Sequence, residues 1–258
     1  MAPTFLNVLA FLLCGLVGVS LGLLGGGGSI LSLPVLVYVA HIDPREAVAL
    51  SLVLVGTTSV TTAFLHRRRD CVDRRVGMLF GLAGLPGAFA GGLLTHLVPP
   101  RRLLLCFAML MLFAGAIMLR RSLREKRIAP VARPRRPALV VLTGTGVGFL
   151  TGFLGIGGGF LIVPALTMFA GLAMPVAIGT SLMVIALNCA AGLVGHLGAA
   201  AMPVVPAIAF TAAAMAGGIA GERLASRTSP RRLRRAFACA ILLVGTYMLM
   251  SNLRALFA

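Results

Sequence analysis

Two glycine-rich segments are the parts of this 258-residue chain best suited to hold a ligand: GGGGS at 25–29 and GIGGG at 155–159. Glycine interrupts an α-helix and adopts backbone conformations closed to other residues. Each segment lies within an apolar stretch, so the helix that begins after it has an N-terminus with partial positive charge and unpaired N–H donors. We therefore expect both segments to bind a small anion through the backbone.

Polar residues in the apolar run that follows each glycine segment extend this candidate site. Hydroxyl and amide groups can donate to the oxygens of an anion, although serine and threonine in helices more often bond the carbonyl one turn back. The residues expected to bind the substrate are Gly25, Gly27, Gly28, Ser29, Ser51 and Thr58 in the first half of the chain, and Gly155, Gly157, Gly158, Gly159, Thr180, Ser181 and Asn188 in the second. Pro34 and Pro164 are expected to have structural roles.

Close helix packing is the alternative explanation for the glycines, because small residues let membrane helices approach one another. For the two glycine-rich segments this alternative stays open. Packing is favoured for Gly87 and Gly91 and for Gly217 and Gly221, since both pairs show the four-residue spacing of small residues at helix interfaces.

Charged side chains are nearly absent from the apolar stretches, and this restricts the chemistry. No Lys or Arg lies deep in a stretch, so a bound anion must rely on helix termini, hydroxyls and amides, which suits a small oxyanion. The six acidic residues form no catalytic pair, and neither an H-E-x-x-H motif nor a cysteine ligand spacing occurs. We therefore expect no enzymatic activity, no metal and no cofactor. Proton coupling, for which His66 and His196 are the candidates, stays open.

The composition indicates that these residues are positioned by membrane helices. The chain is 59% hydrophobic and 11% charged, with a mean hydropathy of +1.03. A single water-soluble domain cannot bury that much apolar surface, so the surplus must face lipid. Long uncharged runs, such as those at 5–24 and 47–65, are typical of membrane helices. The predicted fold class is an all-α polytopic membrane protein.

An internal repeat with an offset of 130 residues organises these runs. Between positions 17 and 119, 31 of 103 residues are identical to the residue 130 positions later. Each half then contains an apolar run, a glycine segment, a short run and three longer runs. The runs lie at about 5–24, 29–40, 46–65, 76–97 and 103–119, and at about 138–154, 159–170, 176–195, 203–222 and 236–252. The predicted division is a first membrane repeat at 1–119, a basic linker at 120–137 and a second membrane repeat at 138–258.

The short runs at 29–40 and 159–170 predict helices that stop partway through the membrane. Twelve helical residues span about 18 Å, against a hydrocarbon core of about 30 Å. We expect each short helix to form a partly re-entrant hairpin with the run before it, and the two glycine breaks to approach each other near the midplane. Discontinuous helices at corresponding positions of two halves are the best sequence indication of a transporter binding site.

The basic residues predict that the two halves have opposite orientations. Of the 23 Lys and Arg residues, 19 lie in three connections, at 66–75, 120–136 and 223–235. Short basic loops next to apolar runs favour the cytoplasmic side, where they meet the anionic leaflet of the bilayer. Equivalent loops of the halves differ in charge, which gives inverted repeats with the linker cytoplasmic and both termini periplasmic. This placement also argues against nucleic acid as a partner.

The paired motifs GGGGSILSLP and GIGGGFLIVP, followed by AVALSL and AIGTSL, resemble the TauE/SafE sulfite exporter family over nearly the whole chain. The resemblance implies a carrier in a bacterial inner membrane for small sulfur-containing anions such as sulfite or organosulfonates. Members of the family are described with seven or eight spans, which agrees with ten apolar runs if the glycine-broken pairs are partly re-entrant. Gly26 and Ser29 stand opposite Ile156 and Gly159, so the two half-sites are not equivalent.

The predicted function is a secondary transporter that moves a small, sulfur-containing anion across the inner membrane by alternating access. A membrane-embedded enzyme, a channel and a non-transporting membrane subunit are the alternatives. The sequence leaves homodimer formation open.

Overall fold

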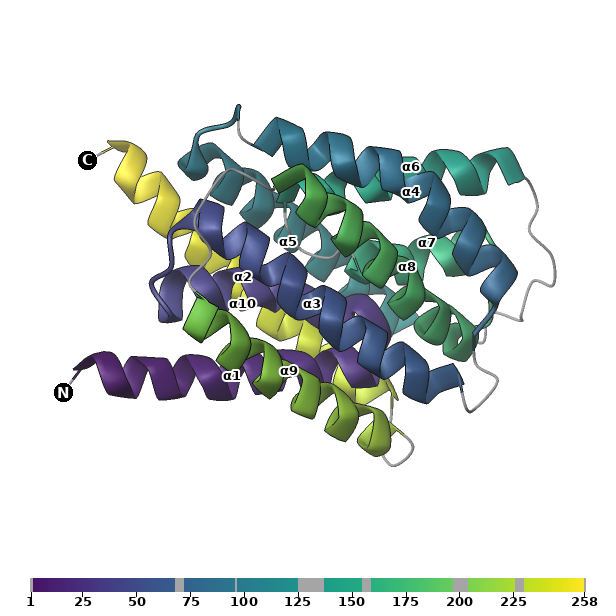
Figure 1. The fold of residues 1–258 in the computed structure, drawn as a ribbon, viewed down its shortest axis with the longest axis horizontal. Helices are drawn as coiled ribbons and strands as arrows, with labels where there is room; N and C mark the ends of the chain where they lie inside the picture. Colours follow the sequence, from purple (N-terminus) through teal and green to yellow (C-terminus); the bar gives the residue numbers. More distant parts are fainter. Residues whose placement is uncertain are drawn as a thin grey trace.

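The computed structural model describes residues 2–67, 72–95, 97–124, 137–154, 159–196, 204–225 and 230–257, and the regular structure in these ranges is helical throughout (Figure 1). The first half contains α1 (Ala2–Leu24), the 3-10 segment η1 (Gly25–Leu31), the short α2 (Ser32–Pro34), the π-helical segment η2 (Val35–Val39), α3 (Pro44–Arg67), α4 (Arg74–Thr95) and α5 (Pro100–Arg124). The second half contains α6 (Pro137–Leu154), α7 (Gly159–Met168), α8 (Met174–His196), α9 (Val204–Ala225) and α10 (Pro230–Phe257). The predicted all-α fold class is confirmed.

Several of these helices have the length and composition of membrane spans. Within the described residues, three apolar helical stretches are long enough to cross a bilayer: Pro44–Leu65, Arg74–Thr95 and Pro175–His196. Shorter apolar stretches occupy Val8–Leu24, Gly28–Val39, Ala138–Leu154 and Ile241–Asn252. Large apolar side chains also point outward from the bundle, with Leu142 71% and Leu243 72% exposed. Such an outer surface is suited to lipid rather than water.

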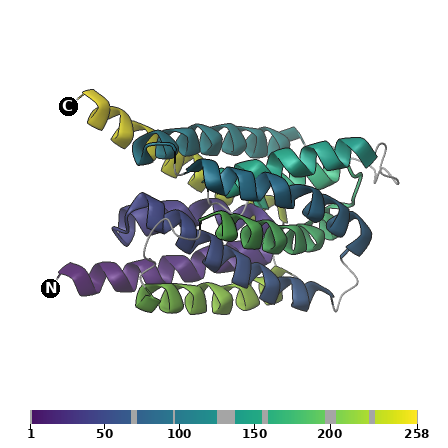
Figure 2. The ribbon, with the colours of Figure 1, turned by 45° about the horizontal axis from the view of Figure 1, so that its top comes forward.

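Two tightly packed helix pairs, one on each side of the bundle, join the two halves of the chain. Helix α1 lies along α9, and α6 lies along α4 (Figures 1 and 2). A Cβ atom added to Gly18 or Gly22 of α1 would overlap the backbone of Ala214 or Gly218 of α9. At the same offset of 130 residues, a Cβ atom added to Gly148 or Gly152 of α6 would overlap Gly84 or Ala88 of α4. The contacts of one pair therefore recur, residue for residue, in the other.

The favoured packing role of the four glycines outside the clusters is confirmed. Gly87 and Gly91 of α4 lie against the backbone of α6, and Gly217 and Gly221 of α9 lie against the backbone of α1. In each case a side chain would meet a carbonyl group of the neighbouring helix rather than a flexible side chain. Small residues at these positions are what allows the helices to approach so closely.

Helices α3 and α8 cross the centre of the bundle in opposite directions. Gly56 lies against Cys189, and Leu52 lies against Gly192, so the numbering rises along one helix as it falls along the other. The glycine contacts also show that α1 and α9 run in the same direction, as do α4 and α6. The orientation of these helices relative to a membrane stays a prediction.

The helix ends that flank basic segments lie together at one end of the long axis of the bundle. Both ends of the chain lie at one end of the molecule, whereas α3 ends and α4 begins at the other (Figure 1). The end of α5, the start of α6, the end of α9 and the start of α10 also lie at this second end (Figures 1 and 2). These helix ends flank the three segments that carry most of the basic residues. The described basic residues at these helix ends, such as Arg74, Arg75 and Arg223, therefore lie toward one end of the bundle, and the positive-inside rule favours such an end for the cytoplasmic side.

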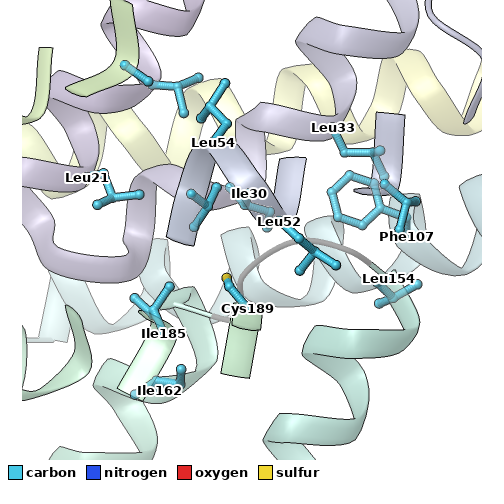
Figure 3. Close-up of a cluster of buried hydrophobic side chains, with 14 of the residues drawn as sticks. Leu21, Ile30, Leu33, Leu52, Leu54, Phe107, Leu154, Ile162, Ile185 and Cys189 are labelled. Atoms are coloured by element: carbon cyan, nitrogen blue, oxygen red, sulfur yellow. The ribbon is translucent and has the colours of Figure 1, made fainter. Parts of the chain in front are cut away.

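The core forms where the broken helices pass between the long ones. Figure 3 shows Leu21, Ile30, Leu33, Leu52 and Leu54 in one cluster of buried side chains with residues of α5 and of the second half. The members contributed by the later helices are Phe107, Leu154, Ile162, Ile185 and Cys189. The short segments of both halves therefore lie in the interior, surrounded by helices of both halves.

Candidate functional site

The first glycine segment breaks the helix at a defined residue. Helix α1 ends at Leu24, and Gly25 follows with φ = +68°, a conformation that residues with a side chain rarely adopt. The next residues are not an open loop, because Gly25–Leu31 forms 3-10 turns and the helical path continues to Val39. The short helix was predicted to begin at residue 29, and this start is wrong because the helical path begins four residues earlier.

The segment that follows the break returns toward the end of the bundle at which α1 begins. Tyr38, at the far end of this segment, accepts a hydrogen bond of 2.7 Å at its hydroxyl from Asn252 Nδ2 near the end of α10. Its ring also lies edge-on to Tyr247, with 5.7 Å between the ring centroids. Since the C-terminal end of α10 lies at the same end of the molecule as the start of α1, α1 and residues 25–39 form a hairpin (Figure 1).

The two glycine segments meet inside the bundle. Gly26 and Gly159 lie so close that a Cβ atom on either one would overlap the backbone of the other. Gly159 is the first residue of α7, and the preceding candidates Gly155, Gly157 and Gly158 lie outside the described residues. Gly27 belongs to η1, but its surroundings also lie outside what the structure describes. The contact between Gly26 and Gly159 agrees with the expectation that the two breaks approach each other.

A serine of the second half lies against the break of the first. Ser181, on α8, is fully buried, and its Oγ accepts a long hydrogen bond of 3.5 Å from the backbone N–H of Gly26. The same hydroxyl donates to the carbonyl of Ile178 at 2.7 Å. Its equivalent on α3, Ser51, is also fully buried and donates to the carbonyl of Val48 at 2.8 Å. The structure therefore places Ser181 at the hairpin tip, where the sequence analysis expects it.

Several other predicted site residues are held in contacts that the fold itself needs. Ser29 Oγ donates to the carbonyl of Gly26 at 2.8 Å, and a side chain on Gly28 would overlap α1 at Ser20. Thr180 Oγ1 accepts a hydrogen bond of 2.9 Å from the backbone N–H of Asp73, just before α4. These contacts give Ser29, Gly28 and Thr180 structural roles, and the proposed binding of substrate by these residues remains a prediction. Pro34 lies buried in α2, and Pro164 lies within α7.

Thr58 and Asn188 differ from the other polar residues because their polar atoms have no hydrogen-bond partner within the described part of the chain. Both side chains are fully buried, and the two positions are equivalent at the 130-residue offset. The side-chain methyl of Thr58 faces Gly218 on α9, and the amide of Asn188 faces Gly84 on α4. By contrast, Thr57 and Thr62 of the same helix α3 donate to the carbonyls of Val53 and Thr58 in the preceding turn.

Ser59 is a residue that the predicted site omits. Its side chain is fully buried beside Thr58, and its Oγ likewise lacks a hydrogen-bond partner among the described residues. The repeat gives no signal for it, because the equivalent position holds Cys189. Only its place in a serine- and threonine-rich stretch of α3 could have indicated it.

The site offers dipoles and no charges. Between residues 47 and 65 of α3, and between residues 175 and 195 of α8, the sequence contains no charged residue. Hydroxyls, an amide and backbone N–H groups are the available ligands, and these groups can donate hydrogen bonds to the oxygens of an anion. These two ranges also contain no histidine, so they hold no carboxylate, lysine or imidazole for acid–base chemistry.

The fold and this buried polar interior together define the class: a polytopic, all-helical membrane transporter. The chain belongs to the sulfite exporter TauE/SafE family, whose model matches residues 10–248. A probable membrane transporter protein of Xylella fastidiosa is 36% identical over 255 residues, covering 95% of each chain. The probable membrane transporter protein YunE of Bacillus subtilis is 24% identical, covering 92% of this chain and 94% of its own. No solved structure matches the chain significantly.

Proposed function

We propose that the protein is a secondary transporter that carries a small sulfur-containing anion, such as sulfite or an organosulfonate, across the bacterial inner membrane by alternating access. The observation that carries the proposal is the contact between Gly26 and Gly159, which brings two broken helical segments from different halves together in the bundle. Paired discontinuous helices at the interface between two halves are characteristic of secondary transporters. Membership of a family described as sulfite exporters supports the choice of substrate class.

Alternating access requires an element that can rearrange while the rest of the bundle holds together. The pairs α1 with α9 and α4 with α6 are tightly packed through glycine, which favours their movement as units. Gly26 and Gly159 lie between these pairs and approach each other backbone to backbone. A rocking movement of one set of helices against the other would open the central residues first to one side of the membrane and then to the other.

Transport by the purified protein in proteoliposomes tests the proposed function. A panel of sulfite, thiosulfate, sulfoacetate, taurine and acetate, measured with and without a pH gradient, identifies the substrate class and the coupling. We expect saturable flux of at least one sulfur oxyanion above that of protein-free vesicles, with little flux of acetate. Equal flux of all five compounds without saturation would indicate a channel, and no flux of any would reject the transporter.

The inverted orientation predicts where single cysteines can be labelled from outside intact cells. We expect a cysteine at Asp43, before α3, to react with a membrane-impermeant maleimide, because this connection belongs to the periplasmic side in our proposal. A cysteine at Arg74, at the start of α4, is expected to react only after the membrane is made permeable. The experiment uses a variant in which the five native cysteines are replaced. Labelling of both positions from the same side would overturn the proposed topology.

A further inference from the structure

Two equivalent helix contacts join the halves toward opposite ends of the bundle. Helix α4 lies against α8, and at the 130-residue offset α9 lies against α3. Helix α4 begins at the end of the molecule at which α9 finishes (Figures 1 and 2). In the proposed topology the start of α4 therefore lies on the cytoplasmic side, and the start of α9 lies on the periplasmic side.

The first turns of α4 accommodate side chains of α8 over glycine, and α9 lacks these glycines. Side chains of α8 occupy the space beside Gly77 and Gly81, where an added Cβ atom would overlap them. The equivalent positions in α9 are Ala207 and Thr211, which carry side chains of their own. Thr211 Oγ1 is buried without a hydrogen-bond partner among the described residues, and an unpaired buried hydroxyl is unfavourable. The contact of α9 with α3 therefore loses less than the contact of α4 with α8 when the helices separate.

A hydrogen bond fastens the start of α4 to α8. Thr180 of α8 is fully buried, and its Oγ1 accepts a hydrogen bond of 2.9 Å from the backbone N–H of Asp73, the residue before α4. Asp73 also caps α4, because its Oδ1 accepts a hydrogen bond of 3.0 Å from the backbone N–H of Val76. Thr180 is adjacent in the chain to Ser181, which lies against the tip of the first hairpin. The first turn of α4 is therefore attached to α8 directly beside the hairpin.

The equivalent hydrogen bond cannot form at the opposite end of the bundle. At the 130-residue offset, Pro203 takes the place of Asp73, and Leu50 takes the place of Thr180. Proline has no backbone N–H to donate, and a leucine side chain has no atom that accepts a hydrogen bond. The amino-acid sequence thus restricts this bond to the end at which α4 begins, in every conformation of the protein.

We propose that the hydrogen bond between Asp73 and Thr180 is a one-sided latch, which makes the conformation closed to the cytoplasm the resting state of the carrier. This inference rests on the proposed function and topology, and it specifies which of the two end states is favoured without substrate. In a carrier built from two inverted halves, exchange of conformation between the halves interconverts the states closed to either side. With identical halves the two states would have equal free energy.

The latch removes this balance because it acts in one state alone. An interaction that is made in one conformation and is impossible in the other shifts the population toward the first. The glycines at the start of α4 act in the same direction, since they favour the contact of α4 with α8 over its equivalent in α9 and α3. Opening to the cytoplasm requires this contact to separate, so the latch must be released before substrate enters from that side.

Single cysteines at two equivalent positions report which side is open. Ser51 and Ser181 are both fully buried, and the antiparallel crossing of α3 and α8 places them toward opposite ends of the bundle. In purified protein whose five native cysteines are replaced, we expect Ser51→Cys to react with a small maleimide faster than Ser181→Cys. The comparison needs no change at Thr180, so it tests the resting state independently of the latch variants.

Two variants of Thr180 test the hydrogen bond itself. Thr180→Val keeps the shape of the side chain and removes the acceptor, whereas Thr180→Ser keeps the hydroxyl and is the matched control. We expect Thr180→Val to raise the labelling rate of Ser181→Cys about three- to tenfold, the usual effect of one hydrogen bond between membrane helices on an equilibrium, and to lower that of Ser51→Cys. Thr180→Ser should leave both rates within about twofold of the parent.

The latch also predicts that its removal increases affinity on one side. A ligand that binds from the cytoplasm meets only the carriers open to that side, so its apparent Kd falls as their fraction grows. In inside-out vesicles, we expect Thr180→Val to lower the KM for sulfite about three- to tenfold and Thr180→Ser to leave it unchanged. A bond that merely anchors α4 would not raise the affinity when it is lost.

The outcomes separate the latch from the proposed function. In a parent protein that transports sulfite, equal labelling of the two cysteines, or faster labelling of Ser181→Cys, would overturn the proposed resting state and leave the transporter intact. Labelling rates and KM that do not differ between Thr180→Val and Thr180→Ser would show that the hydrogen bond is not its cause. A parent protein without flux of any sulfur oxyanion would reject the proposed function itself.

Discussion

Replacing Gly26 with valine is expected to abolish anion flux in proteoliposomes. Even the first side-chain atom at this position would overlap the backbone of Gly159, and backbone inside a packed bundle cannot move aside as a flexible side chain can. The hairpin tip of the first half would then be pushed out of its contact with the second. Gly159→Val should have the same effect, because the overlap is mutual.

Gly146→Val provides the control for this prediction. Gly146 lies in α6, and a Cβ atom added there would meet no atom within 4 Å, so we expect normal expression and flux. Gel filtration in detergent should show that the Gly26 and Gly146 variants are equally monodisperse, which separates loss of transport from loss of folding. Full flux in a folded Gly26→Val protein would show that the contact between the hairpin tips is dispensable.

Alanine at Gly18 is expected to destabilise the protein by about 1–3 kcal/mol, the usual effect of overpacking a tight contact. The added methyl group would overlap the backbone of Ala214 and force α1 away from α9. Because the contact recurs 130 residues later, Gly148→Ala should have an effect of similar size through α4 and α6. Thermal unfolding in detergent measures both changes in stability. Because the chain contains no tryptophan, unfolding is followed by the thiol reactivity of the buried Cys14 and Cys189.

Gly15→Ala in the same helix serves as the comparison for Gly18→Ala. A Cβ atom at Gly15 would lie 3.7 Å from the carbonyl oxygen of Ala213, which is an ordinary contact. Alanine also favours helix over glycine by up to about 1 kcal/mol, so this variant should be as stable as the parent or more stable. Equal destabilisation by Gly15→Ala and Gly18→Ala would contradict the packing described for α1 and α9.

The helices were predictable because uncharged runs and glycine breaks are local features of the sequence. The structure places α8 at Met174–His196, against a prediction of 176–195, and α6 at Pro137–Leu154, against 138–154. The packing role of Gly87 and Gly217 was likewise indicated by spacing alone. The start of the first short helix was not predicted correctly, because the glycines were expected to interrupt the helix for several residues. Within Gly25–Leu31 the positive φ is that of Gly25, and the following glycines continue in 3-10 turns.

The roles of individual polar residues could not be predicted, because they depend on which neighbour each side chain meets. Thr57 and Thr58 are adjacent and identical in type, yet Thr57 is exposed and bonds its own helix, whereas Thr58 is buried and its hydroxyl has no hydrogen-bond partner in the described part of the chain. Thr180 and Ser181 are also adjacent, but one fixes the start of α4 and the other lies at the hairpin tip. These differences arise from the angular position of each residue on a helix relative to helices of the other half.

The pairing of α1 with α9 and of α6 with α4 has a consequence for biosynthesis. Helix α1 is synthesised well before its neighbour α9, which becomes available only when residues after Val204 have been inserted. The glycine face of α1 therefore has no packing partner in the bilayer while most of the chain is still being synthesised. Neither half contains the helix against which its own first helix packs. The two halves therefore reach their packed structure together, late in synthesis.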